Sequence, residues 1–449
     1  MKPLIPLAAI VSVLVSSAAL AQEKKVDREA KVRGDKERVA AMDSWIYDDL
    51  PRGIEEARKT GKPLLVVFRC IPCEACAQLD EDVVTRDPIV AKLLDRFVCV
   101  RIPKANGMDL SLFQFDYDQS WAAFLMNADM TIYGRYGTRS HQTKSEDDVS
   151  LEGFAAAMEG ALALHAKFPV VKKSLAAKSG RRFEVKTPEE FPSFEGKFAP
   201  SLDYSPEKKV VPTCIHCHQV GDAQRRFYRD AGKAIPERLL FPYPNPKVLG
   251  LVMDPKAGAR VASVVKGSSA ETDGFRAGDE IVALGGVPML SIADLQWHLD
   301  AGVGDPKSVV SDAEVLRGGK SVSLDLTLGK GWARNDDISW RATSWGLRRM
   351  TTGGMLLEPL PAADRAKAGV KDGAMALRAK HVGQYGEHAV AKNAGFKKDD
   401  VVVAVAGRTD VMTETAWMTW LVNATKPGDK VPVRLLREGK TVELTLPML

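Results

Sequence analysis

The feature that most constrains the fold of this chain is an internal repeat in its carboxy-terminal half. Residues 274–283 (GFRAGDEIVA) align with residues 395–404 (GFKKDDVVVA), and residues 316–322 (LRGGKSV) align with residues 436–442 (LREGKTV). Each copy then ends in alternating apolar residues, which is the pattern of a half-buried strand. The same motifs in the same order at a similar separation predict two copies of one compact, strand-rich module.

Each copy resembles the bacterial PDZ domain. In that family a turn with small residues and Gly-Asp leads into a strand, which is followed by a helix and a closing strand pair. The resemblance implies a first PDZ-like domain at 248–330, a linker at 331–345 and a second PDZ-like domain at 346–449. PDZ domains bind peptide carboxyl termini by strand addition, so client carboxyl termini are the expected partners. The alternative is that one or both copies are packing units with filled grooves.

The resemblance also indicates the peptide-binding residues. Successive backbone N–H groups of one loop clasp the peptide carboxylate in this family, and a glycine lets the peptide approach. The first copy has such a loop at Leu249, Gly250, Leu251 and Val252. In the second copy the nearest equivalents are Gly354 and Met355.

A cysteine-rich segment follows an apolar run, residues 63–68, that is typical of a buried strand. Cys70, Cys73 and Cys76 are each three residues apart, and apolar residues recur at helical spacing after them. Strand, cysteine pair and helix is the thioredoxin order. A cysteine at a helix amino terminus has its thiolate stabilised by unpaired N–H groups and the helix dipole. We therefore expect Cys73 to be the nucleophile and Cys76 to resolve a mixed disulfide.

Further strand and helix patterns at 97–102, 121–126, 131–137 and 151–164 predict a complete thioredoxin-like α/β domain over residues 45–170. One departure from the family is Ala122, which stands where a cis-proline normally faces the cysteines. That proline helps to align substrate polypeptide, so its absence puts general disulfide exchange in doubt.

Each cysteine of this segment has alternatives. Cys73 and Cys76 are either redox-active, a structural disulfide or buried thiols. Glu74 is expected to disfavour the Cys73 thiolate by its charge. Cys70 stays open between an extra redox partner, a core thiol and a soft ligand for copper or zinc. Cys99 lies inside a strand pattern and is expected to be inert.

Residues 171–247 have weak apolar periodicity and many Pro, Lys and Glu residues, which predicts an irregular connector. Within it, Cys214, Cys217 and His218 form CxxCH, the attachment motif of haem c, in which two thiols bond the vinyl groups and the histidine ligates iron. Met253 is a candidate distal ligand. The covalent haem would need a neighbouring domain to bury it. The alternative is a redox-active or structural CxxC, with or without zinc.

The amino terminus has the pattern of a secretory signal peptide. Lys2 precedes an apolar stretch that ends in Ala-Leu-Ala at residue 21, so we expect residues 1–21 to be a signal peptide and 22–44 a charged tether. A retained anchor is the alternative. We expect a periplasmic or otherwise extracytoplasmic location, with no membrane span after cleavage. The net charge of +5 is spread along the chain and does not favour nucleic acid as a partner.

The sequence thus predicts a multidomain α+β protein. It resembles the bacterial family of exported thioredoxin-like and PDZ domain-containing proteins, some of which carry selenocysteine in the redox motif. That resemblance implies a thiol-disulfide oxidoreductase or related electron-transfer protein that binds client peptides, and leaves client and redox partner open. The alternatives are a haem c electron carrier with regulatory cysteines and a non-enzymatic PDZ scaffold. No serine stands in a Gly-rich turn with suitable His and Asp partners, so a protease is not expected.

Overall fold

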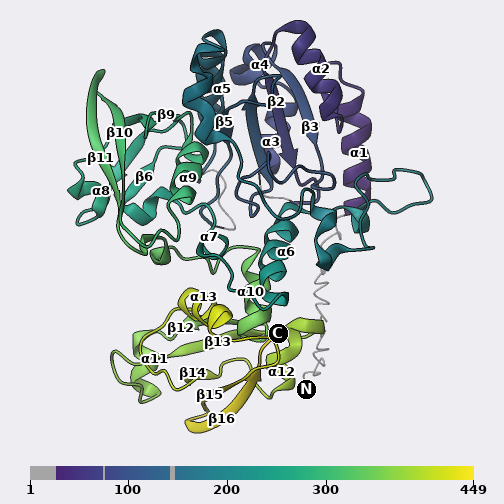
Figure 1. Ribbon diagram of the computed structural model, residues 1–449. Coiled ribbons are helices and arrows are strands. Elements are labelled where there is room, and N and C mark those ends of the chain that lie inside the picture. The colour runs from purple at the N-terminus through teal and green to yellow at the C-terminus, as the bar shows by residue number, and fades with distance from the viewer. Residues whose placement is uncertain (1–26, 74–75, 142–146) are drawn as a thin grey trace, which may run out of the picture.

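A computed structural model describes residues 27–73, 76–141 and 147–449 (Figure 1). The predicted signal peptide and Glu74 lie outside these residues. The amino-terminal helices and the first sheet form one body, the first half of the repeat lies beside it, and the second half lies below, with α6 and α10 between them (Figure 1). In the described ranges, no helix has the length and apolar character needed to cross a membrane.

The first body is built on a five-stranded sheet with the order β1-β3-β2-β4-β5. β1 and β2 run parallel to β3, whereas β4 runs antiparallel to both β2 and β5. Every residue of β2, β3, β4 and β5 is buried, because helices and the following segments cover both faces of the sheet. The strands are β1 (Ile46–Tyr47), β2 (Leu64–Arg69), β3 (Val98–Ile102), β4 (Trp121–Met126) and β5 (Ile132–Tyr136).

The helices of this body are α1 (Arg28–Ala40), α2 (Leu50–Thr60), α3 (Ala77–Val84), α4 (Pro88–Leu94) and α5 (Leu151–Ala166). The first of these corrects the expectation of a charged tether over 22–44. Asp27 caps α1 through the N–H of Ala30, and Val32 and Val39 are buried. The high charge density suggested a solvated segment, but part of that charge has buried partners elsewhere in the fold.

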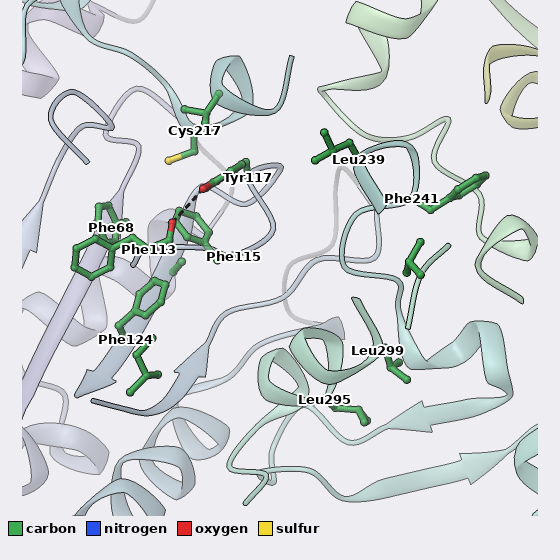
Figure 2. Packing of buried hydrophobic residues seen from close by; sticks show 14 of the residues in the cluster. Phe68, Phe113, Phe115, Tyr117, Phe124, Cys217, Leu239, Phe241, Leu295 and Leu299 are labelled. Carbon is green, nitrogen blue, oxygen red and sulfur yellow. Dashed lines mark hydrogen bonds between the residues drawn. The ribbon is translucent and has the colours of Figure 1, made fainter. Parts of the chain in front are cut away.

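The expected irregular connector is a set of short helices packed between the other domains. Its Ile215, Cys217, Val220 and Leu239 belong to one apolar cluster that also contains Phe113. Figure 2 shows Cys217 and Tyr117 above the phenylalanines of the first body. Leu295 and Leu299 lie at the lower right of the same view. The elements are η2 (Val170–Lys178), η3 (Pro188–Glu190), η4 (Pro192–Phe194), η5 (Val211–Thr213), α6 (Cys217–Asp230), α7 (Glu237–Leu240) and η6 (Pro246–Leu249).

The first repeat forms a four-stranded sheet, ordered β11-β10-β8-β9, and a separate β6-β7 pair. Its helix α9 packs on β5, so that nearly all of α9 is buried. The elements are β6 (Leu251–Met253), β7 (Val261–Val264), α8 (Ser269–Thr272), β8 (Glu280–Leu284), β9 (Val287–Pro288), α9 (Ile292–Ala301), β10 (Val309–Arg317) and β11 (Lys320–Leu328).

The second repeat is a five-stranded sheet in the order β12-β13-β14-β15-β16. The elements are β12 (Met355–Pro359), α11 (Ala362–Lys367), β13 (Leu377–Val382), η8 (Gly386–Ala389), α12 (Val390–Asn393), β14 (Val401–Val405), α13 (Glu414–Ala424), β15 (Lys430–Arg437) and β16 (Lys440–Pro447).

The residues 331–345, expected to be a linker, are also packed. They contain η7 (Trp332–Asn335) and lead into α10 (Ser344–Thr351). Arg341 is buried and donates to both carboxylate oxygens of Asp116 at 2.8 and 2.7 Å, with Asp118 at 3.3 Å. This buried ion pair, made through one guanidinium nitrogen, fixes the segment to the first body.

The repeated sequence motif has the same structural role in both copies. Arg317 is ion-paired with the buried Asp279 at 2.7 Å and donates to the carbonyl of Gly274. In the second copy Arg437 is ion-paired with Asp400 and bonds to Gly395 in the same way. The repeated aspartate and arginine therefore encode a tie between the Gly-Phe turn and the closing strand pair.

Candidate redox and peptide-binding sites

The three clustered cysteines begin at the end of β2. The N–H of Cys70 donates to the carbonyl of Ser120 at 2.9 Å, and the N–H of Cys73 donates to the carbonyl of Cys70 at 3.0 Å. The Arg69 guanidinium donates to the carbonyls of Cys70 and Cys73, both at 2.7 Å. This turn places Cys73 before the helix, because α3 begins at Ala77 and Cys76 is its N-cap. The residue that borders the helix amino terminus is thus Cys76 rather than Cys73.

The cysteines differ in exposure and in acidity. Cys70 and Cys73 are half-buried, whereas Cys76 is buried. Burial, with the nearby Cys73, raises the pKa of Cys70 to about 11. Burial also raises the pKa of Cys76, although a hydrogen bond with Ser120 and the charges of Arg69 and Arg139 oppose it. Cys73 is the accessible sulfur of the Cys73–Cys76 pair, which suits a nucleophile.

A buried ion network lies beneath this turn. Arg69 contacts Asp80 at 3.1 Å, and Arg101 bridges Asp80 at 2.7 Å and Asp35 of α1 at 2.8 Å. The Trp121 indole N–H donates to Asp80 at 3.0 Å. Although burial opposes it, Arg101 and Arg69 hold the pKa of Asp80 below its usual value. The sequence motifs did not point to these residues. The available signal was an arginine at the end of one apolar strand pattern, residues 63–68, and another within the pattern at 97–102.

The CxxCH segment is brought against the same turn. Asn106 is buried; its side-chain oxygen accepts from the N–H of Ile215 at 2.7 Å, and its side-chain N–H donates to the carbonyl of Thr213 at 3.0 Å. His216 is the N-cap of α6, and its Nδ1 lies 3.1 Å from the Cys70 sulfur. The structure thus joins two motifs that are 138 residues or more apart in the chain, as counted from Cys76 to Cys214.

Cys214 and Cys217 are both buried, at 6% and 8% exposure. Burial, with the nearby Cys70, raises the pKa of Cys214 to about 12, and the same causes raise the pKa of Cys217. Both thiols line a cavity together with Cys70. Five of the six cysteines of the chain therefore lie around one end of β2, and only Cys99 is apart.

The space beside these thiols does not fit haem in this arrangement. The cavity measures about 10 Å³, whereas pockets that enclose a ligand or cofactor measure about 300–1,000 Å³. His218 is exposed and stacks on His216, and Met253 lines a different cavity. Among the described residues, no three His, Cys, Asp or Glu side chains are placed to hold a metal ion. Haem attachment stays a prediction, tested by a pyridine haemochrome spectrum of the full chain beside its Cys214→Ala/Cys217→Ala variant.

The loop that is predicted to bind peptide in the first repeat lies next to a cavity of about 340 Å³. Val252 and Met253 of β6 and Ile292 of α9 line one side of it. Leu249 and Leu251 are buried, and Gly250 has φ 92°. A Cβ on Gly250 would lie 2.2 Å from the hydroxyl oxygen of Ser268, so only glycine fits.

The other wall of this cavity comes from the thioredoxin-like body. It is formed by Thr138, Ser140, His141, Asp147 and Asp148. The groove between β6 and α9 is therefore shared between the two domains.

The equivalent loop in the second repeat is closed by packing. Gly354 donates its N–H to Arg348 and accepts from Gly383, and Met355 is fully buried. A Cβ on Gly354 would lie 2.1 Å from the His388 carbonyl oxygen. The structure thus places η8 against this loop.

The fold and site define a chain that contains a thioredoxin-like domain and a PDZ domain. The family model described as thioredoxin-like matches residues 45–128, and that of the PDZ domain matches residues 260–311. The PDZ domain supports peptide binding.

The chain is similar to curated periplasmic proteases over part of its length. It is 26% identical over 43% of the chain to the probable periplasmic serine endoprotease DegP-like of Pseudomonas putida, and covers 38% of that protein. It is 28% identical, also over 43%, to the periplasmic pH-dependent serine endoprotease DegQ of Escherichia coli, of which it covers 37%. The chain therefore spans less than two fifths of the length of these relatives.

Similarity to solved structures is weaker. The HtrA-type protease AlgW with decapeptide is 15% identical over 31% of this chain and 48% of that chain, with a TM-score of 0.21. A likeness at that score carries no argument about function.

Proposed function

We propose that this protein is an extracytoplasmic thiol-disulfide oxidoreductase whose first PDZ domain presents client polypeptides to the Cys73–Cys76 pair. The observation that carries the proposal is one loop shared by both sites. Thr138, Ser140 and His141 line the PDZ cavity, and the charge of Arg139 between them opposes the rise that burial causes in the pKa of Cys76. The extracytoplasmic location is supported by the signal-like sequence at 1–21 and by the periplasmic description of the relatives.

The chemistry follows from exposure. A client thiolate attacks the half-exposed sulfur of Cys73 in the Cys73–Cys76 disulfide, which forms a mixed disulfide and releases the Cys76 thiolate. The Ser120 hydroxyl and the charges of Arg69 and Arg139 stabilise that leaving thiolate. A second client thiolate then attacks the client sulfur and releases Cys73. The client gains one disulfide, and the protein gains two thiols; the reverse sequence reduces a client disulfide.

The test uses a synthetic peptide with one internal disulfide and an apolar carboxyl terminus. With excess reduced glutathione to regenerate the dithiol after each turnover, we expect the full chain to reduce this peptide, Cys73→Ser to add nothing to the rate of glutathione alone, and Cys99→Ser to match the wild type. Amidation of the peptide carboxyl terminus is expected to raise the KM without changing kcat, because it removes PDZ binding alone. Wild-type activity in Cys73→Ser would overturn the redox assignment, and an unchanged KM for the amidated peptide would overturn the role of the PDZ domain.

A further inference from the structure

We infer that Cys214 and Cys217 form a second, buried dithiol that exchanges a disulfide with the Cys73–Cys76 pair through Cys70. The inference rests on the proposed function for the outer pair and adds a redox site to it. It starts from the placement of the CxxC loop, which is fixed on the thioredoxin-like body rather than free. Besides the two bonds from Asn106, the N–H of Ala105 donates to the carbonyl of Ile215 at 2.9 Å.

Cys70 is the residue between the two pairs. On one side it forms a CxxC turn with Cys73, closed by the backbone bond at 3.0 Å. On the other side its sulfur contacts His216, which stands between Cys214 and Cys217 in sequence, and it lines the same cavity as those two thiols. Cys70 is half-buried, whereas both inner cysteines are buried. A client therefore reaches Cys73 and Cys70 more readily than it reaches the inner pair.

The cavity keeps the inner thiols neutral until they react. Its walls include Phe68, Ile102 and Ala105, and apolar surroundings disfavour a thiolate, so each inner cysteine loses its proton only as it attacks, with a neutral disulfide as the product. Cys99 provides the contrast within the same sheet. It is also buried, but its sulfur lies 3.7 Å from the carbonyl oxygen of Leu94 and does not line the cavity. The five other cysteines therefore form a cluster that burial alone does not explain.

The exchange is balanced at each step. The Cys70 thiolate attacks Cys73, which forms Cys70–Cys73 and releases the Cys76 thiolate. The Cys217 thiolate attacks Cys70, which forms Cys70–Cys217 and releases Cys73. The Cys214 thiolate then attacks Cys217, which forms Cys214–Cys217 and releases Cys70. One electron pair passes from the inner to the outer pair, and the two protons that leave the inner thiols match the two taken up by the outer thiolates.

The first experiment traps the intermediate without any client. Cys214→Ser leaves Cys217 with no partner to resolve it, so oxidation of the full chain by diamide is expected to accumulate a Cys70–Cys217 disulfide. Peptide mass spectrometry after acid quench and alkylation identifies it. The crosslink is expected to disappear in Cys214→Ser/Cys70→Ser and to persist in Cys214→Ser/Cys99→Ser. No Cys70–Cys217 crosslink in folded Cys214→Ser would overturn the inference, whatever the outcome for the outer pair.

The second experiment follows transfer in time. The reduced chain is mixed with a substoichiometric amount of the disulfide peptide, and disulfides are mapped at intervals. We expect Cys73–Cys76 to form first and Cys214–Cys217 to follow. In Cys70→Ser and Cys70→Ala the second step is expected to slow at least about tenfold relative to the first, because the connecting thiolate is lost. Wild-type transfer in both variants would refute the relay. Failure of the first step alone would instead count against the proposed function.

Discussion

Replacing Asp294 by asparagine is expected to loosen the PDZ domain from the thioredoxin-like body. Asp294 lies at the start of α9 and is 1% exposed. Its carboxylate accepts from the backbone N–H groups of Arg135 at 3.0 Å and Leu290 at 3.1 Å, and from the Lys178 ammonium at 2.8 Å. Lys178 is fully buried, so water cannot solvate its ammonium once the Asp294 charge is lost.

The magnitude follows from these three bonds. Asparagine keeps the volume and one oxygen acceptor, but leaves the Lys178 ammonium without a counter-charge. Removing one partner of a buried pair costs about 3–5 kcal/mol. At a slope of about 3 kcal/mol per M urea, such a loss lowers the unfolding midpoint by about 1–1.7 M.

The pH dependence has a definite sign. Burial lowers the pKa of Lys178 in the folded protein, and Asp294 opposes this. Without Asp294 the folded protein binds this proton more weakly still, so the variant is expected to regain stability as pH rises toward the unfolded lysine pKa of about 10.4.

The assay is urea unfolding of the full chain, with hydrogen exchange of the peptides from β5 and α9. Asp325→Asn is the matched control, because Asp325 is exposed on β11 of the same domain and the chemical change is identical. Its effect is expected within about 0.5 kcal/mol of zero. Lys178→Met added to Asp294→Asn is expected to restore part of the loss. An equal loss of stability in Asp294→Asn and Asp325→Asn would refute this expectation. So would a double variant whose loss equals the sum of the losses in Asp294→Asn and Lys178→Met.

Three further outcomes follow from the structure. Arg101→Met leaves Asp35 buried without its cation and Asp80 with Arg69 alone, and is expected to cost about 3–5 kcal/mol in urea unfolding. Because the folded pKa of Asp80 is lowered, the Asp80 contribution is present above the unfolded pKa and is lost as pH falls through the folded pKa, so the gap to wild type narrows in acid. Alkylation of Cys70 by iodoacetamide, followed by mass spectrometry, is expected to accelerate about tenfold per pH unit until about pH 11, and a plateau near neutrality would contradict it. Gly250→Ala is expected to weaken peptide binding and to lower the melting temperature, since the φ of Gly250 is 92° and Ser268 blocks a Cβ there. Gly267→Ala is the control, because Gly267 has φ 77° with open space around it and the variant adds backbone strain alone. Calorimetry and peptide titration of both variants check this prediction.

Much of the local structure was predictable because its cause is local. The apolar run before Cys70 became β2, and the Ala122 segment became β4. The repeat predicted two related modules, and its aspartate and arginine positions form the same buried tie in each, Asp279–Arg317 and Asp400–Arg437. Periodicity and spacing carry this information because neighbouring residues of one element share its faces.

The parts that sequence reasoning missed have partners far away in the chain. The charged segment before residue 44 contains a helix whose Asp35 pairs with the distant Arg101. The connector packs because its sparse apolar residues meet aromatic rings of another domain. Such pairings have no signature in local pattern, since they depend on which surfaces meet after the elements form.

The sequence by itself determined the kinds of domain, the cysteine motifs and the glycine that the PDZ loop requires. Only the tertiary structure decided that Cys70 faces the CxxC loop, and that the loop lining the PDZ groove carries Arg139, whose charge acts on Cys76. The physical reason is that reactivity depends on distance and burial. A thiol 3.1 Å from His216 and 146 residues from it in sequence acquires its neighbours from the fold alone.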